Sequence, residues 1–275
     1  MDHSEVNHPY HLVNPSPWPI IASFSLLFVT SGAVMMMHGY NLGHFVLGFG
    51  IISLISCLVK WWKDIVREGL VDHAHTDPVR MGLRIGMALF ILSEVMFFFA
   101  FFFSFFNASI FPEHILDATG IWPISNGTWP PKDIQTFDPW DIPLMNTLTL
   151  LLSGTTVTWA HHAMLENNKK EMVEALGYTV VLGMFFTAMQ AFEYAHAPFK
   201  FTDGIYASNF YMSTGFHGAH VIIGTIFLAV CYFRARRGHF EKGNGHLGFE
   251  FAAWYWHFVD VVWLFLFTFV YVWGQ

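Results

Sequence analysis

Seven long apolar stretches constrain this chain more than any other feature of its sequence. A helix needs roughly 20 mostly apolar residues to cross the hydrocarbon core of a bilayer. Each stretch is that long, is unbroken and lacks the period-two alternation of a membrane β-strand, so we expect seven transmembrane helices. The expected spans are 17–37, 42–62, 79–106, 142–161, 173–195, 205–233 and 247–273.

The composition agrees with a membrane protein and excludes a soluble one. Hydrophobic residues make up 54% of the 275 positions and charged residues 12%, whereas a soluble domain carries about 25% charged residues. We therefore predict an all-α membrane protein forming a single transmembrane domain over residues 1–275. A very short connection at 38–41 and a longer, charged one after the second span suggest two groups of helices. Residues 1–75 would hold the first two helices and 76–275 the other five.

The basic residues predict the orientation of the helices. Cytoplasmic loops carry an excess of Lys and Arg, and the connections after the second, fourth and sixth spans hold eleven of the 13 such residues. Only Lys132 and Lys200 fall on the other side. The N-terminus is thus predicted inside and the C-terminus outside. The eleven inside residues are Lys60, Lys63, Arg67, Arg80, Arg84, Lys169, Lys170, Arg234, Arg236, Arg237 and Lys242.

Glu94 is the clearest functional candidate, because an ionisable group in the middle of a span is costly and rarely accidental. It lies between Ser93 and a Phe-rich run that ends at Phe106. One interpretation is that it handles protons or supports a proton route in a partner. The other is that a protonated Glu94 forms a hydrogen bond to a neighbouring helix. The sequence does not choose between them.

Three polar pairs are spaced three residues apart, which places both members on one helix face. Glu-x-x-His also occurs in di-iron bundles, but such a site needs two of these motifs and two further Glu residues. Facing His residues could ligate a haem. We favour hydrogen bonding between helices and predict neither a metal site nor a catalytic residue. The pairs are Glu193 with His196, His217 with His220, and His257 with Asp260.

The inside rim is rich in cations and aromatics, which suits phospholipid headgroups. Ordinary anchoring at the membrane surface is the alternative. The net charge of −7 comes without a basic stripe interleaved with exposed aromatics, so we expect no nucleic-acid partner.

Taken together, these motifs resemble subunit III of the aa3-type cytochrome c oxidases over nearly the whole chain. The segment 110–125 matches no stretch of that family, which leaves its contacts with neighbouring subunits in doubt. The matching stretches are 15–19 (PSPWP), 61–64 (WWKD), 93–98 (SEVMFF), 129–131 (WPP), 146–147 (NT), 151–154 (LLSG), 158–162 (TWAHH), 190–194 (QAFEY), 215–221 (GFHGAHV) and 248–263.

The resemblance implies a non-redox core subunit of an oxidase that reduces O2 to water and pumps protons. Subunit I, the main contact, together with subunit II, would complete the complex, with haem a and copper in these partners and no cofactor here. Assembly, stability during turnover, proton uptake and oxygen delivery are the implied roles, in a bacterial or mitochondrial inner membrane. Two helices and five helices would enclose a V-shaped cleft filled with phospholipid.

The family's functional residues carry over onto matching positions of this sequence. Glu94 matches the buried carboxylate of the family. A stand-alone channel or transporter is the first competing function, although no paired broken helices support it. A haem or metal enzyme in its own right is the second. The implied lipid-binding residues are Trp62, Arg67, Glu68, His75, Arg84, Phe90, Arg234 and His239.

Overall fold

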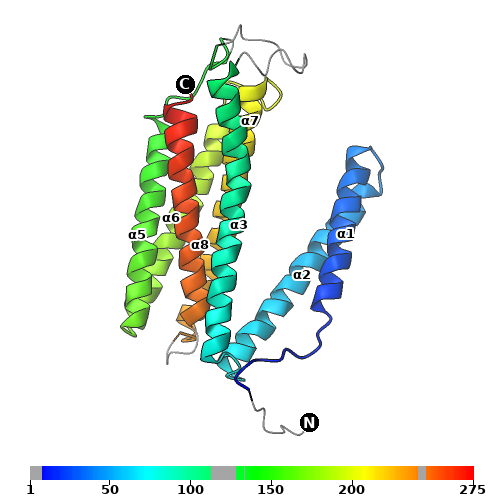
Figure 1. Cartoon of the computed structure of the whole chain (residues 1–275), viewed down its shortest axis with the longest axis vertical. Coiled ribbons are helices and arrows are strands. Elements are labelled where there is room, and N and C mark those ends of the chain that lie inside the picture. Colours follow the sequence, from blue (N-terminus) through cyan, green and yellow to red (C-terminus); the bar gives the residue numbers. More distant parts are fainter. Residues whose placement is uncertain (1–7, 113–127, 133, 241–245) are drawn as a thin grey trace. The chain divides into compact units, whose positions relative to one another are not determined.

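All the regular secondary structure in the part that the structure describes is helical. The computed structural model describes residues 8–112, 128–132, 134–240 and 246–275, and these include no β-strand (Figure 1). The prediction of an all-α chain is therefore confirmed. The helices are α1 (Trp18–Met37), α2 (Gly43–Leu70), α3 (Asp77–Ile110), α5 (Ile142–Leu165), α6 (Lys169–Ala195), α7 (Ile205–Arg236) and α8 (His246–Phe265), and α8 runs on into the π-helical segment η1 (Leu266–Val272).

Each of the seven predicted spans falls on one of these helices. Six are long and apolar enough to cross a membrane, with α8 and η1 counted as one. The exception is α5, whose sequence is rich in Thr and Ser. Its buried polar residues include Asn146, Thr147 and Ser153, and each forms a hydrogen bond inside the protein. The polar composition of α5 therefore reflects contacts within the helix bundle.

Two helices extend well beyond their predicted ends. The second span was expected to end at residue 62, but α2 continues to Leu70, and α3 begins at Asp77 and ends at Ile110. At 1.5 Å per residue, the 34 residues of α3 extend about 50 Å, more than the ~30 Å hydrocarbon core. The prediction followed apolar residues only, and so it left out the charged turns at the end of α2 and the short polar stretches at both ends of α3.

The chain divides into two compact units, Met1–Gly82 and Leu83–Gln275, with the division inside α3. The V-shaped cleft concerns the relation between these units and stays a prediction, as does the orientation of the termini. Most of the segment 110–125, for which no family match was found, lies outside the described residues, and so does Lys242.

The first unit is built on a close hairpin of α1 and α2. Three glycines lie at the contact, and a Cβ atom added at Gly32, Gly43 or Gly50 would meet backbone atoms of the facing helix. Small residues let membrane helices approach closely, which increases van der Waals contact where no hydrophobic effect drives association. Ser25 and Ser53 add a 2.8 Å hydrogen bond across the contact.

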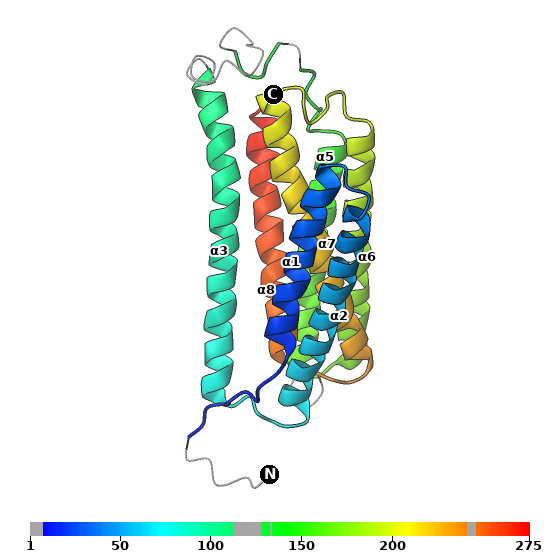
Figure 2. The same cartoon turned by 90° about the vertical axis from the view of Figure 1, so that its right-hand side faces the viewer.

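The second unit contains a ring of four helices in which α5 contacts α6, α6 contacts α7, α7 contacts α8, and α8 contacts α5 (Figures 1 and 2). Its core is rich in aromatic side chains. Trp256 and Trp263 of α8 are fully buried, and their indole N–H groups donate to Ser153 and Thr147 of α5 at 2.9 Å each. Buried indoles need such acceptors, so the Ser and Thr residues of α5 position α8.

Within the same unit, the part of α3 from Leu83 onward runs alongside the ring of helices (Figure 2). Phe98 and Phe105 are its fully buried anchors. Near its end, Ser104 donates a 2.7 Å hydrogen bond to Asn209 of α7. Two further contacts of α3 involve carboxylates: Glu94 meets His220 of α7, and Arg84 meets Glu250 of α8.

Candidate functional site

The Glu94 carboxyl group meets His220 of α7. Oε2 of Glu94 lies 2.8 Å from Nε2 of His220, and the two side chains are 22% and 12% exposed. The separation of 126 positions in sequence gives no local signal for this pair. The structure thus supplies the neighbouring helix that one interpretation of Glu94 requires.

The hydrogen bonds of His220 define how many protons the pair holds. Nδ1 of His220 lies 2.7 Å from the carbonyl oxygen of Phe216, which can only accept, so Nδ1 carries a hydrogen. The short contact between Nε2 and Glu94 then needs one further proton. Either a neutral Glu94 donates to Nε2, or a protonated ring donates to the carboxylate. The pair can therefore shift a single proton between two helices.

Aromatic rings surround this pair. The centroid of the His220 ring lies 5.0 Å from that of Phe98 and 6.2 Å from that of Tyr255, and Phe97 and Phe258 complete the surroundings. Such a low-dielectric environment strengthens the hydrogen bond and makes loss of either partner costly.

The three predicted polar pairs have different outcomes. Only in the pair of His257 and Asp260 do the two side chains meet, with Nδ1 3.6 Å from Oδ2. His257 also reaches Oγ1 of Thr158 at 3.1 Å. Asp260 lies against Gly154, where a Cβ atom would collide with the carboxylate. This pair therefore connects α8 to α5.

The first pair, Glu193 and His196, separates at the end of α6. Glu193 is 1% exposed and accepts from the hydroxyl of Tyr271 at 2.7 Å and from the amide of Gln190 at 3.3 Å. Asn146 of α5 donates in turn to Gln190 at 3.3 Å. His196 instead caps the helix, with Nδ1 2.9 Å from the carbonyl oxygen of Phe192. No pattern in the sequence pointed to Tyr271 as the partner of Glu193.

The second pair also separates, because its two rings leave α7 toward different neighbours. His217 is fully buried, and its Nε2 lies 3.2 Å from the carbonyl oxygen of Val259 in α8. The rings of Phe186 and Trp263 pack on it. Each imidazole thus has a protein partner of its own.

The lipid-binding candidates of the first unit lie at the end of α2 and just after it. Trp62 and Arg67 are exposed, and Glu68 and His75 are half-buried. Burial is the main cause that lowers the pKa of His75, and nearby His11 lowers it further. The sequence did not single out His11, which comes close to Glu68 and His75 only in the folded unit.

In the second unit, Arg84 is already paired. Its Nε and Nη2 each donate at 3.0 Å to the carboxylate of Glu250 in α8, which is a bidentate contact. The exposed ring of Phe90 stacks on Tyr255 at 6.3 Å. The sequence prediction assigned Arg84 to lipid and did not identify Glu250 as its partner.

Arg234 and His239 have unused polar atoms near the end of α7. The guanidinium of Arg234 lies 4.8 Å from the ring centroid of Phe240. Among the described residues, buried Nε of Arg234 and Nδ1 of His239 have no hydrogen-bond partner. Burial lowers the pKa of His239, and the charges of Arg234 and Arg237 lower it further.

Comparison with known proteins decides the family. The family model for cytochrome c oxidase subunit III matches residues 8–275. The chain belongs to the cytochrome c oxidase subunit III family. A protein of Rickettsia bellii (strain RML369-C) named probable cytochrome c oxidase subunit 3 is 66% identical over 270 residues, covering 98% of this chain and 97% of the relative.

Members of the cytochrome c oxidase subunit III family from more distant organisms also match along nearly their full length. The relative from Prototheca wickerhamii is 55% identical over 267 residues, covering 97% of this chain and 98% of that protein. The relative from Scyliorhinus canicula is 50% identical over 268 residues, covering 98% of each. Both are named cytochrome c oxidase subunit 3. The chain is thus a multi-pass inner-membrane subunit of a respiratory oxidase complex.

Proposed function

We propose that this chain is a non-redox core subunit of its oxidase and that the pair of Glu94 and His220 supports proton uptake by the complex. The complex would reduce O2 to water and pump protons in aerobic electron transport. Assembly, stability during turnover and a route for oxygen would be further roles of this subunit. Subunit I would be its main contact, with subunit II in the same complex.

The single shared proton of Glu94 and His220 carries this proposal. A group that relays protons must be able to hold the proton in two places, and the 2.8 Å contact lets either Glu94 or His220 hold it without movement of the backbone. Its position at a contact between α3 and α7 also lets a change of protonation alter how α3 is held. A purely structural hydrogen bond would need neither property.

The absence of a redox centre from this chain is also part of the proposal. A haem iron or a copper ion takes unoccupied imidazole nitrogens as ligands. In this chain both ring nitrogens of His220 are engaged, Nδ1 with Phe216 and Nε2 with Glu94, whereas His217 bonds to Val259 through Nε2 and its buried Nδ1 has no partner among the described residues. The engaged His220 ring supports haem a and copper in the partner subunits.

Phospholipid binding is the third element of the proposal. Arg67 and Trp62 are exposed at the end of α2, where a cation and an indole suit a headgroup and its glycerol region. In the second unit, buried Arg234 Nε and His239 Nδ1 need a partner outside the described residues. A lipid phosphate would supply acceptor oxygens to both, and Phe90 would contact an acyl chain. Such lipids would fill the cleft that the family resemblance implies.

The decisive experiment measures the turnover of complexes that carry Glu94→Gln from about pH 6 to about pH 9. Protons are scarcest at the upper end of this range, so a defect in proton uptake should show there. The amide keeps the size of a protonated carboxyl group, so assembly should be normal. Turnover should decline at high pH more steeply than in the wild type. Glu174→Gln is the control, because Glu174 is exposed and its carboxylate accepts a hydrogen bond from Tyr178 of its own helix.

Unchanged turnover of Glu94→Gln across this range would refute the proton role. Stoichiometric haem or copper in the purified chain alone would refute the non-redox assignment. The two results are independent, so either part of the proposal can fail without the other.

A further inference from the structure

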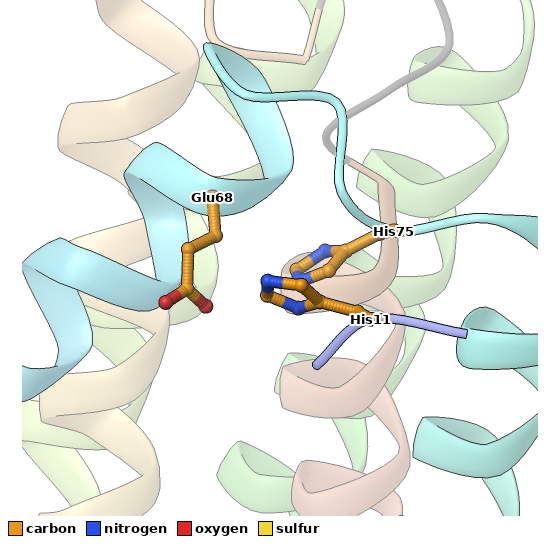
Figure 3. Close-up of side chains that lie close together, drawn as sticks. All are labelled: His11, Glu68 and His75. Carbon is orange, nitrogen blue, oxygen red and sulfur yellow. The ribbon is translucent and has the colours of Figure 1, made fainter. Parts of the chain in front are cut away.

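Three potential metal ligands gather at the end of the first unit. The ligand atoms of His11, Glu68 and His75 all lie within 4.8 Å of one another (Figure 3). They come from three segments: the stretch before α1, the last turn of α2, and the connection between α2 and α3. Figure 3 shows the carboxylate of Glu68 beside the two imidazole rings, with one of its oxygens on their side.

The connection after α2 holds His75 in place because it folds back onto the helix. The amide of Ala74 donates to the carbonyl of Glu68 at 3.0 Å, and His73 takes a left-handed conformation with φ of 49°. Gly69 leaves room for the ring, since a Cβ atom there would lie 2.8 Å from Nδ1 of His75. The backbone thus brings His75 next to Glu68.

A separate contact places His11. The hydroxyl of Thr76 donates to the carbonyl of Pro9, which fastens the segment before α1 to the connection between α2 and α3. The rings of His11 and His75 then meet at a centroid distance of 6.3 Å, tilted by 62°. All three residues are half-buried. A metal ion bound between them would therefore still face solvent on one side, where water could complete its coordination.

The chemistry of these groups selects a particular class of ion. Two imidazoles and one carboxylate suit Zn²⁺ and its divalent first-row neighbours, whereas Ca²⁺ and Mg²⁺ prefer oxygen ligands only. Ligand atoms that bind a zinc ion at about 2.0–2.2 Å lie about 3.4 Å from one another. Side-chain rotations that move the ligand atoms by about 1 Å would bring the present cluster to that spacing. Burial lowers the pKa of His75, and a neutral ring keeps the lone pair that a metal needs.

We propose that His11, Glu68 and His75 form a binding site for a divalent first-row transition metal ion, which clamps the segment before α1 onto the end of α2. The proposal goes beyond the oxidase function and does not depend on it. A lipid ammonium headgroup could also contact Glu68, but it gains nothing from two imidazole lone pairs. The metal ion therefore accounts for all three groups.

The test adds Zn²⁺ to the purified oxidase complex after chelator treatment and counts the zinc bound. The wild type should bind one zinc ion more per copy than His11→Ala or Glu68→Gln, with at least ~10-fold weaker binding in each variant. His8→Ala is the matched control, since His8 lies in the same segment and its ring contacts that of Tyr10. Zinc-edge X-ray absorption should show two imidazole ligands in the wild type.

Two further measurements keep the test decisive. Zinc should slow backbone hydrogen exchange in residues 8–16 of the wild type and leave it unchanged in Glu68→Gln. Gly69→Ala, which displaces the His75 ring without removing a ligand, should weaken zinc binding as well. Equal zinc content in the wild type and His11→Ala would overturn the proposal. Loss of phospholipid in Glu68→Gln with unchanged zinc binding would also overturn it and assign the carboxylate to a lipid headgroup.

Discussion

Two parallel hydrogen bonds of 3.0 Å join Arg84 of α3 to Glu250 of α8. Because α3 has few buried side chains, this bidentate pair is one of the contacts that hold it to the ring. Glu250→Gln should loosen α3 and destabilise the complex by about 1 kcal/mol, since the pair is partly exposed. Thermal dissociation of this subunit from the complex would measure the change.

Asp77→Asn is the control for that measurement. Asp77 forms an ion pair with Arg80 of its own helix at 3.8 Å, and its side chain is 97% exposed. Exposed pairs of this kind contribute little to stability. A Glu250→Gln complex as stable as Asp77→Asn would show that the bidentate contact does not hold α3.

The contact between α1 and α2 allows a matched pair of glycine substitutions. Gly50→Ala would drive its methyl group into the backbone of Val29, so the hairpin must open, at a cost of about 1–3 kcal/mol. Gly48→Ala places a methyl group in open space and should be neutral or slightly stabilising. Denaturant unfolding in detergent micelles would compare them. Equal stability of the two variants would contradict the close approach.

The sequence predicted the helices better than their partners. Span positions follow from apolar length, so the seven predicted spans coincide with helices, and the missed parts include the charged end of α2 and the two ends of α3. The partners of Glu94 and Glu193 could not be predicted, because His220 and Tyr271 come from distant segments and helical spacing records neighbours on one helix only. For the same reason, spacing placed His217 with His220, although their rings reach different helices.

Composition also concealed the role of α5. Its Thr and Ser residues lower the mean hydropathy of the helix. In the structure, Ser153 and Thr147 accept hydrogen bonds from Trp256 and Trp263. A polar residue in a membrane helix lowers hydropathy whether it faces lipid or a buried donor. Sequence alone cannot separate these cases without knowing which helices are neighbours.

If Arg67 and Arg234 bind phospholipid, removing both side chains should reduce the amount of lipid bound to the complex. Arg67→Ala combined with Arg234→Ala should reduce the phospholipid that copurifies with the complex, because each arginine would lose a phosphate contact. Arg236→Ala is the control, since its guanidinium already lies 5.8 Å from the ring centroid of Tyr232. Lipid extraction and mass spectrometry would give the amounts. Full retention in the double variant would argue against both assignments.

The surroundings of His75 predict how its charge responds to pH. Its pKa lies below the ordinary value of 6.5, first because of burial and then because of His11, while Glu68 acts in the opposite direction and Arg80 adds to the lowering. Diethyl pyrocarbonate acylates neutral imidazole, so labelling of His75 should persist below pH 6.5 when a chelator is present. Fragment-ion mass spectrometry separates this residue from His73.

Two substitutions should move the pKa of His75 in opposite directions. His11→Ala removes a group that lowers the pKa of His75, so the midpoint of labelling should rise toward 6.5. Glu68→Gln removes the carboxylate that stabilises the charged ring, so the midpoint should fall further. His8→Ala should leave it unchanged, because His8 is not among the groups that act on His75. A midpoint that moves the same way in His11→Ala and Glu68→Gln would show that the two side chains do not face His75 as the structure places them.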